Sequence, residues 1–400
     1  MKQRRVLVAL ALLYATQGIP FGLAAEYLPV VLRKSGASLA TIAALSWLQL
    51  PWQAKIVWSG AADRPFARTH ARPILLTLQL ALAVVVATYA IVPFASARVV
   101  WFSITALAAL FAATQDVFVD ATAVRVLGPD ERGIGNIAQV AGYRLGILIG
   151  GAGLLVVISD FGERRSILVC ASLIALASVA AFFLREEHDP ERVDRSVDRL
   201  AARALLKHLF SREVWPVVAL AASYKLGLHL AAVLIKPMVV DAQWSTREIG
   251  IAVVSAGTAA GLLGAVAGGL AHKKLGDTRA LLIAGLAQAA ACLPLIAAAT
   301  LHVPRPLTIA AIACEHFASG IGTTVLFAAL MSATRPANAG MHYTILTSAN
   351  ALSIGLGGVL GGRVGDRLGY PATYAIAAVA CLAPLMLLPR WKHAAAASAT

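Results

Sequence analysis

Long apolar stretches recur along the whole chain and alternate with short polar connections. Each stretch is long enough to cross a hydrocarbon core of about 30 Å as a helix that rises ~1.5 Å per residue. We expect twelve such helices, over residues 6–31, 39–62, 73–92, 99–120, 135–158, 166–184, 213–240, 249–271, 280–299, 307–330, 342–362 and 371–388. The pattern therefore predicts an all-α membrane protein with twelve transmembrane helices.

One polar segment interrupts this pattern after the sixth apolar stretch. Residues 185–212 read REEHDPERVDRSVDRLAARALLKHLFSR, and their alternating acidic and basic side chains are typical of a solvated helix. We therefore expect an N-terminal six-helix half over residues 1–184, a linker over residues 185–212 and a C-terminal six-helix half over residues 213–400. Two halves of this kind are typical of transporters built from structural repeats, with the substrate site between the repeats.

Glycines recur three or four positions apart in three of the expected helices. They are Gly142, Gly146 and Gly150 in the fifth, Gly257, Gly261, Gly264 and Gly268 in the eighth, and Gly357, Gly361 and Gly365 in the eleventh. Such spacing lets helix backbones approach each other closely. The pattern is compatible with static tight packing and with sliding between the halves.

Composition agrees with a membrane protein, since 59% of the residues are hydrophobic and only 14% are charged. The formal net charge of +14 would fit a nucleic-acid partner if the basic residues gathered on one element. They are instead spread over the connections between the apolar stretches, so we expect no nucleic-acid partner.

The distribution of Lys and Arg predicts the orientation in the membrane, because cytoplasmic loops retain positive charge. If the N-terminus lies in the cytoplasm, the cytoplasmic connections carry more than twice as many Lys and Arg residues as the opposite side. We therefore expect both termini in the cytoplasm.

Charged side chains within the expected helices are the strongest functional signal, because an ionised group at the bilayer centre costs at least ~2.5 kcal/mol. Asp116 and Asp120 lie one turn apart on the fourth helix, and Arg144 lies in the middle of the fifth. We expect Arg144 to bind either Asp116 or a carboxylate or phosphate of a substrate. The alternative is a static buried ion pair that fixes the helix register.

Four more charged positions extend this set. Lys55 in the second helix and Lys225 in the seventh would give a basic cavity that attracts anions. Glu26 in the first helix and Glu315 in the tenth are carboxyl groups that could exchange protons during coupled transport. Glu315 is alternatively a structural partner of Lys225.

Polar and aromatic side chains complete the candidate site. Gln17 is expected to line the cavity, and Tyr143, with Trp52 and Trp58, to stack on a ring of the substrate. The alternative for the aromatic residues is packing or anchoring at the membrane interface.

Four segments of the first half carry a family resemblance. They are YATQGIPFGL (14–23), PWQAKIVWSGAADR (51–64), ATQDVFVD (113–120) and GYRLG (142–146). In this order they resemble the branch of the major facilitator superfamily that holds AmpG-type muropeptide permeases, acetyl-CoA transporters and certain siderophore permeases. The second half is similar only in general pattern, and residues 59–62 (SGAA) depart from the Ala-Pro of the relatives.

The resemblance implies a major facilitator fold and a secondary active permease that works by alternating access. It further implies import of a small anionic solute across the bacterial inner membrane, coupled to protons. Muropeptides and siderophores are the favoured cargo, and acetyl-CoA is the alternative. The length of 400 residues leaves no room for the two extra helices of some muropeptide permeases, which slightly favours siderophores.

An intramembrane enzyme is the rival class. The Asp-x-x-x-Asp pattern of Asp116 and Asp120 is similar to carboxylates that hold magnesium on a diphosphate in prenyl transfer. Such an enzyme needs a second acidic cluster, and the same spacing recurs only at Asp194 and Asp198 in the linker. We therefore expect no enzyme, no cofactor and no metal site, and a monomer whose partners are the solute, protons and the bilayer.

Overall fold

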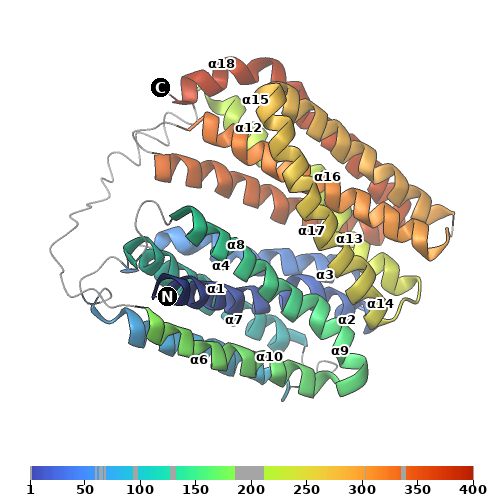
Figure 1. Ribbon diagram of the computed structural model, residues 1–400. Coiled ribbons are helices and arrows are strands. Elements are labelled where there is room, and N and C mark those ends of the chain that lie inside the picture. Colours follow the sequence, from blue (N-terminus) through green and yellow to red (C-terminus); the bar gives the residue numbers. More distant parts are fainter. Residues whose placement is uncertain are drawn as a thin grey trace. The chain divides into compact units, whose positions relative to one another are not determined.

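The computed structural model describes residues 2–58, 61–62, 66, 69–92, 98–126, 132–184, 211–301, 303–334 and 339–399. Every regular element among these residues is a helix (Figure 1). Nine helical stretches in the described part are long and apolar enough to cross a membrane. The predicted all-α membrane class is confirmed.

Two of these nine stretches are long enough for two crossings each. Thr246–Thr300 has 55 residues and Ile345–Ser398 has 54, which at ~1.5 Å per residue is more than twice the thickness of the hydrocarbon core. Each contains a glycine with non-helical backbone, Gly276 (φ 69°) or Gly369 (φ 77°), where the chain can turn. The expected second helix is broken into short pieces between Leu39 and Val57, so it does not count among the nine. If the two long stretches are counted as two crossings each and the broken second helix is added, the nine stretches are consistent with twelve crossings.

The chain forms two compact units. Unit 1 consists of Met1–Ser35, Trp47–Asp194 and Trp244–Val254, and unit 2 of Gly36–Ser46, Arg195–Gln243 and Ser255–Thr400. Unit 2 thus includes residues 36–46, whose neighbours in sequence belong to unit 1. Unit 1 includes residues 244–254, whose neighbours in sequence belong to unit 2. These segments contain the beginnings of the second and eighth expected helices.

Unit 1 contains most helices of the first half of the chain and the short helix α14 of the second half. They are α1 (Lys2–Gly22), η1 (Leu23–Tyr27), α2 (Leu28–Lys34), α4 (Leu50–Ala54), η3 (Lys55–Val57), α6 (Ala71–Thr88), α7 (Arg98–Val126), α8 (Arg132–Leu148), η7 (Ile149–Gly153), α9 (Leu154–Phe161), α10 (Glu163–Ala177), η8 (Ser178–Phe183) and α14 (Thr246–Glu248). Two further segments, η2 (Ala44–Gln49) and η9 (Ile249–Ser255), cross the boundaries between the units.

Close packing of α1 on α8 forms the centre of unit 1. A Cβ atom on Gly142, Gly146 or Gly150 would overlap the backbone oxygen of Ala11, Ala15 or Ile19 respectively. The close approach predicted from the glycine spacing is therefore confirmed for this helix. It fixes the register of α1, which carries several of the candidate site residues.

The first transmembrane stretch is irregular near its middle. The π-helical segment η1 follows Pro20, whose ring and missing N–H interrupt the regular hydrogen-bond ladder of α1. A second π-helical segment, η7, packs against η1 and continues α8. The helices that begin with α1 and α8 thus both become π-helical where they pack against each other.

Unit 2 contains the remaining helices. They are α3 (Leu39–Ala43), α12 (Trp215–Ser223), α13 (Leu226–Asp241), α15 (Ala256–Thr300), α16 (Arg305–Ser332), α17 (Ala339–Leu382), η11 (Ala383–Leu387) and α18 (Leu388–Ala399). Glycines again stand at the close contacts: Gly264 faces the backbone of Phe317, and Gly361 faces that of Leu230. The predicted close approach is confirmed for the eighth and eleventh helices too.

Helix α3 is fixed to α17 by its N-terminus. The carboxylate of Asp366 accepts hydrogen bonds from the backbone N–H groups of Leu39 (2.7 Å) and Ala40 (2.9 Å), and Ser38 caps the N–H of Thr41 (3.1 Å). The first N–H groups of a helix have no acceptor within the helix, and here the carboxylate of Asp366, distant in sequence, accepts two of these hydrogen bonds.

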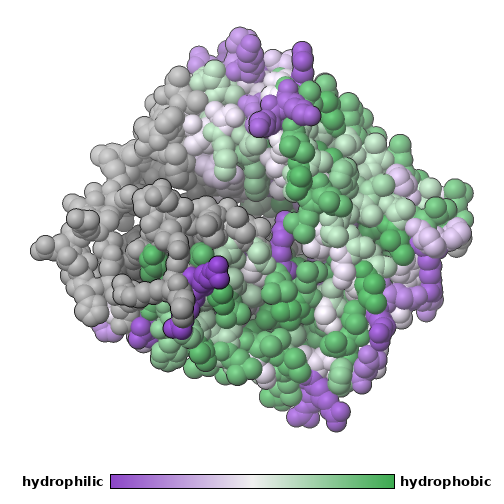
Figure 2. Space-filling model, in the orientation of Figure 1, coloured by the Kyte–Doolittle hydropathy of each residue, from purple (hydrophilic) through white to green (hydrophobic). Residues whose placement is uncertain are grey.

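The surface of the described part is strongly apolar. Large hydrophobic side chains such as Val84, Leu176, Val379 and Met386 are exposed. Figure 2 shows hydrophobic side chains over most of the visible described face and hydrophilic ones gathered near its edges. Such a surface is typical of a protein in contact with lipid chains.

Candidate functional site

An ion-pair cluster lies in unit 1 between the second and fourth expected helices. Lys55 at the start of η3 forms an ion pair with Asp116 on α7, and its Nζ lies 3.8 Å from Oδ2 of Asp120, one turn further along. The Asp116 side chain is only 12% exposed, whereas those of Lys55 and Asp120 are 33% and 40% exposed. The cluster is thus buried at one end and open at the other.

Asp120 has two more partners from neighbouring helices. Its Oδ1 accepts a hydrogen bond from the hydroxyl of Tyr14 on α1 (2.7 Å) and one from the amide of Gln139 on α8 (3.1 Å). Four elements therefore meet at one carboxylate pair. With both carboxylates ionised, the three charged groups carry one surplus negative charge.

The expected pairing of Arg144 with Asp116 is not found. The partner of Asp116 is Lys55, because η3 brings the lysine within reach of α7. Arg144 is half-buried on α8 and forms no ion pair within the part of the chain that the structure describes. The ion pair between Lys55 and Asp116 does not test the other prediction for Arg144, which is binding of a substrate anion.

Aromatic side chains form a corner beside Arg144. The ring of Phe21 on α1 lies 5.6 Å from that of Trp52 on α4 at an interplanar angle of 86°, and 5.7 Å from that of Tyr143 on α8 at 52°. Gln17 precedes Phe21 by one helical turn and is fully buried, and neither of its amide atoms has a hydrogen-bond partner among the described residues. The buried indole N–H groups of Trp52 and Trp58 also find no partner in the described part of the chain.

A neutral hydrogen-bond network supports the cluster, and it was not identified from the sequence. Gln115 donates to Gln79 (2.5 Å) and to Thr16 (3.2 Å), and Gln79 donates to the carbonyl of Ile174 (3.0 Å). The network ties α1, α6, α7 and α10 together next to Asp116. Tyr14 and Gln115 lie in the segments that carry the family resemblance. Their polar side chains in otherwise apolar helices are the sequence feature that could have predicted this network.

Unit 2 contains a second buried charged cluster. Lys225 stands where the seventh expected helix breaks between α12 and α13, is 2% exposed, and donates to the carbonyl (3.0 Å) and hydroxyl (3.1 Å) of Ser319 on α16. Glu315, one turn before Ser319, lies 2.9 Å from Nδ1 of His316. The charges of Lys225 and Glu315 interact, but the direct partner of each is a different group.

Glu26 lies apart from both clusters. It is half-buried on η1, where its side chain packs against Gly151 of η7. This position joins the two π-helical segments of unit 1.

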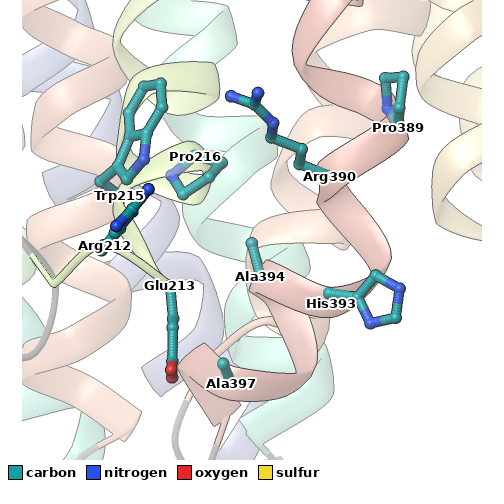
Figure 3. Close-up of a pocket in the computed structure, with 9 residues that line it drawn as sticks. All are labelled: Arg212, Glu213, Trp215, Pro216, Pro389, Arg390, His393, Ala394 and Ala397. Atoms are coloured by element: carbon teal, nitrogen blue, oxygen red, sulfur yellow. The ribbon is translucent and has the colours of Figure 1, made fainter.

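A cavity of about 600 Å³ lies elsewhere, between the beginning of α12 and α18 of unit 2 (Figure 3). It contains none of the residues that the sequence singled out. No group of three or more His, Cys, Asp or Glu side chains that could hold a metal is found among the described residues.

Comparison with known proteins assigns the chain to a family. The family model described as the Major Facilitator Superfamily matches residues 6–304 and 217–398. The chain is 28% identical to the anhydromuropeptide permease of Escherichia coli (strain K12), over 97% of this chain and 79% of that protein. It is 25% identical to a transporter of Rickettsia conorii called AmpG 4, over 93% of this chain and 92% of that protein.

Solved structures with a similar fold are also transporters. The nucleoside transporter NupG superposes with a TM-score of 0.71 at 13% identity, over 97% of this chain and 99% of that one. The xylose transporter XylE from E. coli, in an inward open conformation, superposes with a TM-score of 0.66 at 14% identity, over 97% and 94%. At this identity the likeness concerns the fold alone.

Proposed function

The chain belongs to the major facilitator superfamily and is a membrane transporter, and from this premise we propose that it imports a small anionic solute of the muropeptide type. The import is driven by protons and crosses the bacterial inner membrane. The relatives at 25–28% identity support this cargo, because one is named an anhydromuropeptide permease.

Arg144 is the observation that carries the proposal. Arg144 is half-buried and has no ion pair within the described residues, whereas Lys55, Asp116 and Asp120 of the same unit pair with one another. An uncompensated cation at membrane depth costs free energy, which a bound anion recovers. A muropeptide carries carboxylates on its peptide, and a guanidinium binds a carboxylate with two parallel hydrogen bonds.

The carboxylate pair supplies the proposed coupling to protons. Lys55 compensates one of the two carboxylates of Asp116 and Asp120, so one proton would bring the cluster to neutrality. Tyr14 and Gln139 join this cluster to α1 and α8, the helix that carries Arg144. Gain or loss of the proton thus changes the charge next to the proposed anion site.

The aromatic corner supplies a place for the sugar of such a cargo. Phe21, Trp52 and Tyr143 do not stack in parallel, so they offer ring faces and edges at an angle rather than a slot for a flat base. A saturated sugar ring fits an angled corner through its C–H groups. The unpartnered amide of Gln17 could then hydrogen-bond to hydroxyl or acetamido groups, which would offset its present desolvation cost.

The cluster in unit 2 has a proposed accessory part in coupling. Glu315, which is buried, and His316, which is partly exposed, form a pair of titratable groups one turn from the bond of Lys225 to Ser319. We assign proton exchange to this pair and a charge-balancing part to Lys225. Glu26 is assigned a gating part, since it lies at the junction of η1 and η7.

Topology and assembly complete the proposal. The bias of Lys and Arg supports cytoplasmic termini. We propose that the protein acts as a monomer.

The test is uptake of labelled anhydromuropeptide into proteoliposomes with and without an inward proton gradient. Iron-loaded carboxylate siderophore, acetyl-CoA, a nucleoside and xylose serve as competing cargoes. Gradient-dependent uptake of the muropeptide, competed poorly by the others, supports the proposal. Uptake of a neutral cargo alone would contradict it, and preference for acetyl-CoA or the siderophore would correct the cargo.

A further inference from the structure

The cavity in unit 2 lies at one end of helix α12 and contains none of the residues of the proposed transport site. Its lining includes Trp215 and Pro216 at the beginning of α12, and Pro389, Ala394 and Ala397 on α18 (Figure 3). Trp215 begins a candidate membrane span, and α18 follows the last expected crossing. The cavity therefore lies at the depth where lipid headgroups meet the hydrocarbon core.

Helix α18 has the character of an interfacial helix. Leu388, Trp391, Ala394 and Ala395 are buried in the hydrophobic core of unit 2, whereas Arg390, Lys392 and His393 on the same helix are exposed. The apolar face of α18 thus packs on the protein, and its basic face is left exposed. Its packing against α12 places its basic face next to the beginning of that helix.

The charges that line the cavity are mainly positive. The lining contains two arginines, Arg212 and Arg390, and one carboxylate, that of Glu213, together with His393. Neither arginine forms an ion pair within the described part of the chain. In Figure 3 the guanidinium of Arg390 points toward the side of Trp215, whereas the carboxylate of Glu213 points toward Ala397. The arginines thus remain available to an external anion.

We propose that this cavity binds the phosphodiester headgroup of an anionic phospholipid. Two guanidinium groups suit one phosphate, since arginine binds phosphate oxygens in pairs. A basic pocket between transmembrane helices is a recognised type of site for anionic headgroups. A volume of about 600 Å³ accommodates a headgroup with its glycerol.

A lipid rather than a free phosphate is the ligand, because half of the lining is apolar. The indole of Trp215, which is 38% exposed, and the rings of the two prolines would contact the glycerol and the first methylene groups. A soluble, hydrated phosphate ion would gain no favourable contact from these apolar side chains. The exposed tryptophan at a headgroup level is itself typical of the membrane interface.

The experiment is native mass spectrometry of the purified full chain with phosphatidylglycerol, and separately with phosphatidylcholine. The test variant is Arg212→Gln/Arg390→Gln. The matched control is Arg363→Gln/Arg367→Gln, which removes two exposed arginines from the same unit. We expect the test variant to bind phosphatidylglycerol about 25-fold more weakly, at about fivefold for each arginine, and the control to change less than twofold.

Several outcomes would overturn the proposal. Equal loss in both double variants would mean general attraction by positive charge, and equal binding of phosphatidylcholine would mean no selection of the headgroup. Displacement of the lipid by millimolar glycerol phosphate would mean a site for soluble phosphate. If the double variant does not fold, as judged by its melting temperature in phosphatidylcholine, Arg390→Gln alone is used, with an expected loss of about fivefold.

Discussion

Individual charged residues within the helices have distinct environments, and these determine what each can do. Asp116 is buried with Lys55 as its partner, Lys225 is buried with Ser319, and Arg144 is half-buried without an ion pair in the described part. Removing one member of a buried pair leaves an uncompensated charge and costs about 3–5 kcal/mol. We therefore expect mutations at paired positions to affect stability, and mutation of Arg144 to affect the proposed transport without a comparable loss of stability.

Replacement of Arg144 by alanine should reduce uptake with little loss of folded protein. A hydrogen bond to a charged group contributes ~1.5–3 kcal/mol, so uptake at low cargo concentration should fall at least about tenfold. The measurement is initial uptake in proteoliposomes, with folded yield from size-exclusion chromatography. Arg165→Ala, at an exposed arginine of the same unit, is the control and should transport normally. Loss of folded protein in Arg144→Ala alone would assign the residue a structural role.

Replacement of Asp116 by asparagine should uncouple transport from protons. The change removes the surplus negative charge, so that Lys55 and Asp120 balance each other without a proton. Uptake should then depend little on the proton gradient, although exchange of cargo across the membrane should persist. Asp160→Asn, at an exposed carboxylate of unit 1, should retain the dependence. An unchanged response to the gradient in Asp116→Asn would remove this residue from the coupling scheme.

Helix packing depends on glycines at the points of closest approach. Gly142 and Gly146 of α8 and Gly150 of η7 face the backbone of α1, so a Cβ atom at any of them pushes the helices apart. This contact also sets the distance between Tyr14 and Gln139, the two hydrogen-bond partners of Asp120 on these helices.

Gly146→Ala should destabilise the protein by about 1–3 kcal/mol, because the added methyl group overlaps the backbone of Ala15. Gly355→Ala is the matched control, since a Cβ atom there meets no atom within 4 Å. The control should stabilise the helix by up to about 1 kcal/mol. Thermal unfolding in detergent measures both, and equal shifts of the melting temperature would refute the packing argument.

Asp366→Ala should loosen the beginning of the second expected helix. The change removes two hydrogen bonds to the N-terminus of α3 and should cost about 1 kcal/mol locally. Hydrogen exchange in the peptide that covers residues 36–46 should become faster, whereas exchange in α16 should not change. The neighbouring Arg367→Ala should have no effect, and equal exchange in both variants would show that the cap contributes nothing.

The whole molecule consists of two units that each include the beginning of a helix from the adjoining half of the sequence. The segments 36–46 and 244–254 each start with a serine-capped helix, at Ser38 and Ser245. Each segment is thus followed or preceded in the chain by residues of the other unit.

The proposed orientation is tested by labelling of single cysteines in a background without the four native ones. Arg165→Cys should react with an impermeant maleimide from outside the cell, whereas Lys273→Cys should react only after the membrane is opened. The reason is the bias of positive charge toward the connections that include Lys273. The reverse labelling would invert the topology, and therefore the direction of the proposed import.

The sequence by itself determined the class of the protein. The length of each apolar stretch, and the free-energy cost of a charged side chain within it, can be read from local composition alone. The sequence also predicted the crossings, the glycine contacts and the charged residues that the structure places in two clusters, including Lys55, Asp116, Asp120 and Lys225. The described helices confirm the fold class, and the family match confirms the transporter.

The tertiary structure alone decided which of these residues meet. Distances along single helices suggested Arg144 as the partner of Asp116, but the break of the second helix into η2, α4 and η3 brings Lys55 there instead. The amide network of Gln79 and Gln115, the aromatic corner around Phe21 and the basic cavity beside α18 join residues distant in sequence. Helical periodicity fixes the face on which a side chain lies, but the neighbouring helix that it contacts depends on packing across the whole unit.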